Sequence, residues 1–177
     1  MPLESLRPLI VPSAYFASGE FLAPHIRLAA PDLALTCVLL DNDQTMLYVQ
    51  PPLAESWEEA GIDWREAALA EMRRADEGLL WTHEKRDETN RLIWIGFMNA
   101  DGLGSSRLLL KDELERQFPE GYYVALPDRS CGIAISRNTA WDGLGELRTM
   151  VADMYRDATI PMCPDIRDPE VLSLRAA

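Results

Sequence analysis

A pattern of two apolar strand-like segments followed by a helix-like segment occurs three times between residues 34 and 157, and it constrains the fold more than any other feature of the 177-residue chain. In each case a short polar segment rich in turn formers separates the two strand-like segments, which is typical of a β-hairpin. Antiparallel hairpins that alternate with helices favour an α+β domain. We therefore expect a mainly antiparallel sheet from three hairpin–helix (ββα) units, with the helices packed on one face.

The bounds of the three units follow from their apolar periodicity. The expected strands are 35–40 and 45–49, 79–85 and 92–98, and 122–126 and 131–136, and the expected helices are about 63–76, 105–118 and about 145–157. The second and third helices are each introduced by an Asp-Gly-Leu-Gly phrase, at 101–104 and 142–145. This phrase indicates either a structural repeat or the coincidental use of one tight way to begin a helix.

Residues 1–33 lack the hairpin pattern and contain five prolines. Apolar clusters at 9–11 and 15–16 argue against a disordered tail, because such tails are poor in aromatic and branched residues. We expect residues 1–33 to be a Pro-rich arm packed on the core and residues 34–177 to form a single α+β domain, consistent with the usual size of one domain.

The charge balance argues against two classes of partner, although it does not exclude a local basic patch. The chain has 17 Lys and Arg against 29 Asp and Glu, a formal net charge of −12, whereas nucleic acids and anionic membranes require a basic surface. No segment approaches the roughly 20 apolar residues of a membrane span, and the N-terminus lacks a secretory signal pattern. The three distant cysteines predict reduced thiols. We expect a cytoplasmic protein that binds neither nucleic acid nor membrane.

The residues that usually carry catalysis are scarce. The only histidines are His25, in the Pro-rich arm, and His83, inside an expected strand. No Gly-x-Ser-x-Gly elbow is present, and the cysteines and histidines lack the spacing of a metal site. We therefore predict no catalytic residue, no metal and no cofactor, which favours a non-catalytic protein and leaves the question of an enzyme open.

Two short segments could hold an anion. Ser105, Ser106 and Arg107 follow the first glycine phrase, where free backbone N–H groups at the start of a helix can face a negative charge. Asp128 and Arg129 lie in the expected turn between the last two strands, and a guanidinium fork suits a carboxylate or phosphate. The structural alternatives are a serine helix cap and an internal salt bridge of Arg129. The anion interpretation requires Ser106, Arg107 and Arg129 to converge in one pocket.

Two of the five tryptophans are candidate contacts for a partner protein. Trp57 lies in an acidic segment and Trp141 precedes the last helix, so both could be partly exposed anchors. The alternative is that they fix loops onto the core.

Four segments carry a resemblance to a known family. They are Thr-Met-Leu-Tyr-Val-Gln at 45–50 with Trp57 and the helix after it, Ser-Ser-Arg-Leu-Leu-Leu at 105–110, Val-Ala-Leu-Pro-Asp-Arg at 124–129 and Ile-Pro-Met-Cys-Pro-Asp at 160–165. Their order across residues 35–170 resembles the YtpQ-like proteins, a bacterial family of cytosolic proteins with a domain of unknown function. The resemblance implies a shared fold and a cytosolic location, and it implies no established reaction.

These observations favour a non-catalytic protein-binding or regulatory domain, for example an inhibitor that neutralises a basic partner by complementary charge. The alternative is a small-molecule or anion-binding protein, or an enzyme of unknown substrate, that uses the region of Ser105–Arg107 and Asp128–Arg129. A homodimer is a third possibility. The binding hypothesis predicts a contiguous apolar patch on the surface.

Overall fold

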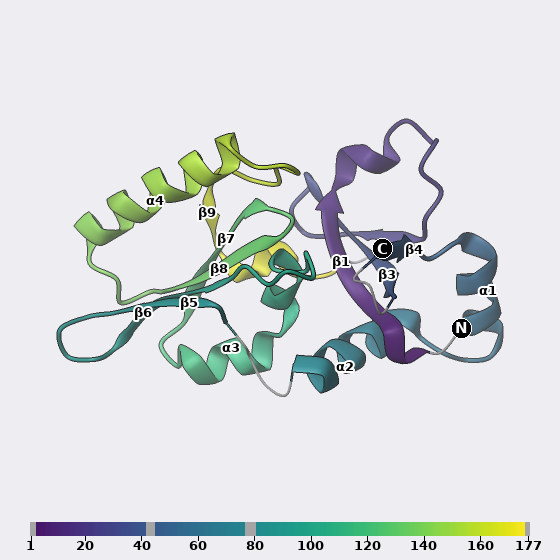
Figure 1. Cartoon of the computed structure of the whole chain (residues 1–177), viewed down its shortest axis with the longest axis horizontal. Coiled ribbons are helices and arrows are strands. Elements are labelled where there is room, and N and C mark those ends of the chain that lie inside the picture. Colours follow the sequence, from purple (N-terminus) through teal and green to yellow (C-terminus); the bar gives the residue numbers. More distant parts are fainter. Residues whose placement is uncertain (1–2, 42–44, 77–80, 176–177) are drawn as a thin grey trace. The chain divides into compact units, whose positions relative to one another are not determined.

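The structure is a computed structural model that describes residues 3–41, 45–76 and 81–175, apart from the side chains of Asp76, Trp141 and Asp142 (Figure 1). The chain forms two compact units: unit 1 comprises Met1–Gly78 with Ser173–Ala177, and unit 2 comprises Leu79–Leu172. The expected division into an arm and a single domain over 34–177 is therefore wrong. The expected α+β class is confirmed, because both units combine helices with an antiparallel sheet.

Unit 1 contains a four-stranded antiparallel sheet around a central strand. Its strands are β1 (Leu6–Pro12), β2 (His25–Arg27), β3 (Leu33–Leu40) and β4 (Met46–Tyr48). β1 pairs with β3 over its full length, while β2 and β4 pair with successive parts of β3. The expected hairpin over 35–49 is confirmed by the pairing of β3 with β4, and residues 42–44 of its turn lie outside the described residues.

The prolines of residues 1–33 do not make an arm, because two segments of this region are strands of the sheet. Pro8 and Pro12 lie in β1, opposite Cys37 and Leu33 of β3. Among the described strands β1 pairs only with β3, so it is an edge strand. A proline is tolerated there because its missing N–H leaves no partner strand unsatisfied.

Helices cover one face of the unit 1 sheet. They are α1 (Pro51–Glu59) and α2 (Trp64–Asp76), and two short 3-10 helices, η1 (Leu3–Ser5) and η2 (Ser13–Phe16), flank β1. Cys37 and Leu39 of β3 form a buried cluster with Trp57, Trp64 and Ala68. The expected helix at 63–76 corresponds to α2, whereas α1 was not expected from the sequence. The two prolines of α1 occupy its first turn, where a missing N–H costs nothing.

Unit 2 contains a five-stranded antiparallel sheet in the order β5-β6-β8-β7-β9. Its strands are β5 (His83–Arg86), β6 (Leu92–Phe97), β7 (Tyr122–Asp128), β8 (Cys131–Ser136) and β9 (Ile166–Arg167). The two expected hairpins are confirmed by the pairing of β5 with β6 and of β7 with β8. The C-terminal part of unit 2 adds β9 beside β7.

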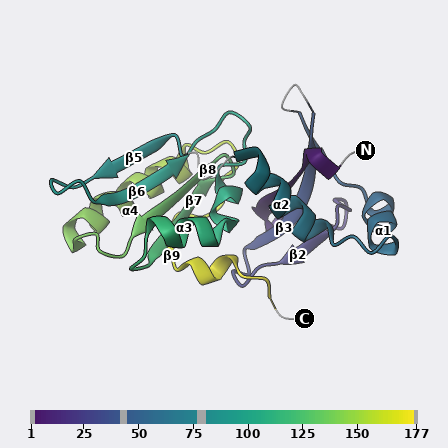
Figure 2. The same ribbon diagram turned by 90° about the horizontal axis from the view of Figure 1, so that it is seen from below.

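The helices of unit 2 lie on both faces of its sheet, which corrects the expectation of one covered face. α4 (Trp141–Arg156) packs with Leu147 and Val151 onto Ile133 and Ile135 of β8. The opposite face carries η3 (Ser105–Leu109), which approaches β8 at Gly132, and α3 (Lys111–Gln117). Figures 1 and 2 show α3 and α4 on opposite sides of the sheet. The helix expected over 105–118 is thus a 3-10 helix followed by an α-helix, and η4 (Pro169–Leu172) closes the unit.

All three cysteines are buried and free. Within the described ranges, none of the helices combines the length with the apolar composition that crossing a membrane requires.

Candidate functional site

The expected anion-binding segment is buried, and its arginine forms an ion pair within the fold. Ser105 and Ser106 are fully buried and Arg107 is 4% exposed. The Arg107 guanidinium donates through Nη1 to Oδ1 of Asp101 at 3.0 Å and through Nη2 to Oδ2 at 2.6 Å. A two-pronged bond of this kind balances the charge of the arginine within the fold.

The residue that follows the glycine phrase, Ser105, contacts the β7–β8 turn at a backbone carbonyl and not at a side chain. Both the N–H and the hydroxyl of Ser105 donate to the carbonyl oxygen of Arg129, at 3.1 and 2.7 Å. The N–H of Arg129 donates to the carbonyl of Ile160 at 3.1 Å, and its Nε is buried without a hydrogen-bond partner among the described residues. The contacts therefore hold the turn in place.

Asp128 fixes the same turn from its other side. Its Oδ1 accepts from the N–H and hydroxyl of Ser130 at 2.7 and 2.6 Å, and its Oδ2 accepts from the N–H of Ile160 at 2.9 Å. Burial alone would raise the pKa of this carboxyl, but the hydrogen bonds from Ser130 and Ile160 and the charge of Arg129 together lower it. Asp128 is thus an ionised carboxylate with satisfied oxygens.

Ser106, Arg107 and Arg129 do not line a common pocket among those described below, which corrects the expectation from the sequence. Of the cavities of about 750, 230, 360 and 430 Å³ that the described residues form, none has Ser106, Arg107 or Arg129 in its lining. The tryptophans need a similar correction: Trp57 is 7% exposed within the core of unit 1, so it stabilises the packing of α1 and is not an exposed anchor. Trp141 begins α4, and its side chain lies outside the described part of the structure.

An open groove of about 750 Å³ lies in unit 2, and we call it the α4 groove. One wall of this groove is a face of α4. Its residues recur at helical spacing and are Glu146, Met150, Asp153 and Met154, followed by Asp157 at the end of the helix. The β7–β8 turn and the end of β6 line it as well.

The apolar lining of the α4 groove consists mainly of sulfur-containing side chains. Met98, Met150 and Met154 are half-buried and pack on the core that includes Ile133 and Val151. Cys131 lines the groove and is 4% exposed. Burial, and secondly the charge of Asp128, raises the pKa of the Cys131 thiol to about 12, so the sulfur is a neutral apolar surface at neutral pH.

The charged lining of the α4 groove is entirely acidic. Asp128, Glu146, Asp153 and Asp157 contribute carboxylates, and no lysine or arginine is among the lining residues. Asp153 pairs with Arg156 at 2.5 Å, while Glu146 and Asp157 are exposed. The groove therefore combines an apolar floor with a negative potential.

Apart from Asp128, the residues that line this groove were not among the sites expected from the sequence. The signal of this groove was the recurrence of acidic residues and methionines on one face of the helix expected at 145–157. That signal could not be separated from an ordinary solvated helix face before the sheet that α4 packs against was known.

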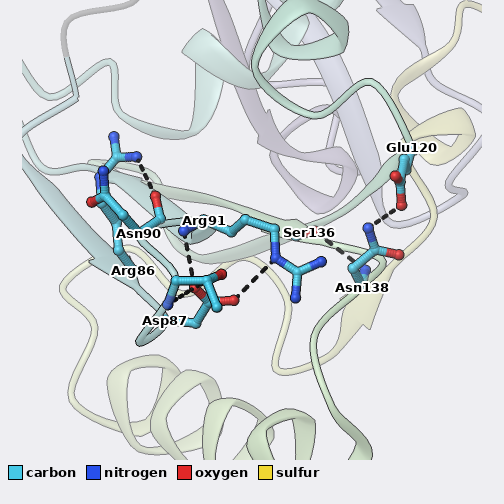
Figure 3. Close-up of polar contacts among 8 residues, drawn as sticks. Arg86, Asp87, Asn90, Arg91, Glu120, Ser136 and Asn138 are labelled. Atoms are coloured by element: carbon cyan, nitrogen blue, oxygen red, sulfur yellow. Dashed lines mark hydrogen bonds and ion pairs between the residues drawn. The ribbon is translucent and has the colours of Figure 1, made fainter.

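A second cavity, of about 230 Å³, lies in unit 2 near the β5–β6 turn and the start of α4, and it is lined in part by Lys85, Asp87, Arg91 and Asn138. The Asp87 carboxylate accepts from the N–H and hydroxyl of Thr89 and the N–H of Arg91, and it pairs with the Arg91 guanidinium at 3.2 Å (Figure 3). The Thr89 hydroxyl is the largest of the causes that lower the pKa of Asp87 to about 2.

Two further polar side chains near this cavity are paired, whereas the buried hydroxyl of Thr139, which lines it, has no hydrogen-bond partner among the described residues. Arg86 donates to the carbonyl of Asn90 at 3.2 Å, where Asn90 has the left-handed φ of 66° that such a turn requires. In the turn that follows β8, Asn138 bonds to Ser136 and Glu120 (Figure 3). Local structure accounts for this network, so the α4 groove is the better candidate.

Within the described ranges, no group of three or more His, Cys, Asp or Glu side chains is arranged to hold a metal ion. The chain matches no family model, no curated protein and no solved structure. The resemblance to the YtpQ-like family therefore stays a prediction.

Proposed function

We propose that this protein is a non-catalytic binding module that docks a basic, partly apolar segment of another protein in the α4 groove. The observation that carries this function is the lining of the groove, in which every charged side chain is a carboxylate and the floor is formed by methionines. The lining is thus complementary to a partner segment that carries positive charges and apolar side chains.

Charge complementarity selects a basic segment. Glu146 and Asp157 are exposed at opposite ends of one face of α4, so lysine or arginine side chains can reach both. Opposite potentials accelerate encounter and disfavour acidic competitors. The net charge of −12 adds a long-range attraction for the same partners.

The methionine floor selects apolar side chains between the basic ones. Met98, Met150 and Met154 are unbranched and polarisable, and such side chains adapt to different apolar partners without a fixed shape. Leucine, methionine or phenylalanine side chains are therefore suitable anchors.

The two groups in the groove that could carry chemistry support a binding role. The Asp128 carboxylate is held ionised by three hydrogen bonds, and the Cys131 thiol is neutral because its pKa is raised to about 12. A general acid near neutrality needs the opposite shift of a carboxyl, and a nucleophilic cysteine needs the opposite shift of a thiol.

Selection of peptides from a random displayed library on the immobilised full chain tests this function. We expect the selected peptides to carry a net positive charge with interspersed apolar residues. Binding should shift the methyl NMR signals of Met98, Met150 and Met154. The Glu146→Lys/Asp157→Lys variant should weaken binding at least about tenfold and reduce its salt dependence.

The matched control is Glu55→Lys/Glu59→Lys, which makes the same change of charge at two exposed positions of α1. It should bind the selected peptides nearly as well as the natural chain does. Selected peptides without a basic bias, or equal losses in the two variants, would show that the groove is not the docking site.

A further inference from the structure

Unit 1 contains a pocket of about 360 Å³ whose charge is opposite to that of the chain as a whole. Its polar and aromatic lining is Ser13, Phe16, His25, Arg27 and Arg175. No aspartate or glutamate is among its lining residues, although acidic residues outnumber basic ones in the chain by 29 to 17. The fold thus gathers basic side chains in this pocket although acidic residues predominate in the chain.

The backbone places the two arginines directly opposite each other. The N–H of Ala29 donates to the carbonyl of Ser173 at 2.8 Å, and the N–H of Arg175 donates to the carbonyl of Arg27 at 3.1 Å. These bonds flank the antiparallel bridge between Leu28 and Leu174, which makes Arg27 the cross-strand partner of Arg175. Opposed residues of an antiparallel pair project from the same face, with Cβ atoms about 4.5–5.5 Å apart.

This pairing carries a cost that the fold does not offset. Like charges directly opposite each other on two strands repel. Both arginines are exposed, and neither forms an ion pair with a carboxylate of the described residues. Many other arginines of the chain do form ion pairs, among them Arg65, Arg74, Arg86, Arg91, Arg107, Arg116, Arg137 and Arg156.

The remaining walls are held in place by local contacts. His25 lies two residues before Arg27 on the same exposed side of β2, and the Phe16 ring stacks on its imidazole at a centroid distance of 3.6 Å and an angle of 13°. Nδ1 of His25 lies 3.2 Å from the carbonyl of Ala23 and donates to it. The Ser13 hydroxyl donates to the carbonyl of Pro31 at 2.9 Å. The pocket thus has an aromatic wall next to its paired cations.

We propose that this pocket binds the phosphate group of a small phosphate monoester, with Arg27 and Arg175 as its two cationic ligands. A phosphate monoester carries close to two negative charges at neutral pH on three terminal oxygens, so it can neutralise both guanidinium groups and accept from both planar forks. A carboxylate neutralises only one of them. The stacked Phe16 and His25 rings offer an apolar surface to the organic group of the ester. This site is separate from the α4 groove and does not depend on its function.

Titration of the full chain with inorganic phosphate, phenyl phosphate and acetate at constant ionic strength tests the proposal. The arginine Nε–H signals of Arg27 and Arg175 in NMR spectra are the readout. We expect saturable shifts with both phosphates, tighter binding of phenyl phosphate, and weaker binding of acetate. Arg27→Gln and Arg175→Gln should each lower the affinity for phenyl phosphate at least about tenfold.

Arg116→Gln is the matched control, because Arg116 is an exposed arginine of α3 and does not line the pocket that contains Arg27 and Arg175. It should leave the phenyl phosphate affinity unchanged. In phosphate-free buffer, Arg27→Gln and Arg175→Gln should melt at or above the temperature of the natural chain, since each removes a repulsion. The absence of saturable binding, equal binding of acetate, or unchanged binding by both variants would overturn the proposal.

Discussion

At the scale of single residues, Arg107 shows how a side chain that is suited to a ligand can serve the fold. Its side chain is 4% exposed and that of Asp101 is 21% exposed, and the shorter of their two contacts is 2.6 Å. Transfer of both charges from water is costly, so the pair stabilises unit 2 only while both partners are present. Removal of one partner leaves a buried charge that water cannot reach.

We therefore expect Asp101→Asn to lower the free energy of unfolding by about 3 kcal/mol. Urea denaturation followed by tryptophan fluorescence measures this loss. The control is Asp168→Asn, since Asp168 is 60% exposed and pairs with Arg137 at the surface, where an ion pair contributes about 0–1 kcal/mol. Similar losses in the two variants would mean that the Arg107–Asp101 pair is not a buried structural pair.

At the scale of elements, the two Asp-Gly-Leu-Gly phrases adopt different structures. The first lies in the turn before η3, with Gly102 at a φ of 69°, and the second lies in the first turn of α4. A Cβ on Gly104 would lie 2.0 Å from the carbonyl oxygen of Ser130, whereas a Cβ on Gly145 would meet no atom within 4 Å. The phrase is therefore not a structural repeat.

This contrast predicts opposite effects of two glycine-to-alanine changes. Gly104→Ala forces η3 away from the β7–β8 turn and should destabilise the protein by about 2–4 kcal/mol. Gly145→Ala removes a glycine from an exposed helical position and should stabilise it by about 0.5–1 kcal/mol. Thermal unfolding of the two variants beside the natural chain measures both effects, and a common sign would contradict the close approach at Gly104.

The elements also show what local patterns can predict. All three hairpins were predictable, because each joins two strands that are neighbours in the sequence through a short polar turn. β1 was not, because its prolines indicate an irregular segment until its position at a sheet edge is known. The α4 groove was equally out of reach, since its lining comes from β6, the β7–β8 turn and α4 together.

At the scale of the whole molecule, unit 1 is assembled from two distant parts of the chain. Residues 79–172 form unit 2, and the chain then returns to unit 1 at Ser173. The backbone bonds of Ser173 and Arg175 to Ala29 and Arg27 join residues that are more than 140 positions apart, so no local pattern predicts them. For this reason, the sites expected at Ser105–Arg107 and Asp128–Arg129 do not include the pocket that Arg27 and Arg175 line.

Because residues 173–175 return to unit 1, loss of their backbone pairing and loss of the Arg175 charge should have different effects on hydrogen exchange. A chain that ends at Leu172 lacks the carbonyl of Ser173, so the amide of Ala29 should exchange with solvent at least about tenfold faster, while the amides of β6 and β8 keep their protection. Arg175→Gln keeps the backbone bonds and should leave the exchange of Ala29 unchanged. Phenyl phosphate binding should be weakened in both chains. Hydrogen exchange followed by NMR measures these rates, and unchanged protection of Ala29 in the shortened chain would mean that residues 173–175 do not form part of unit 1 in solution.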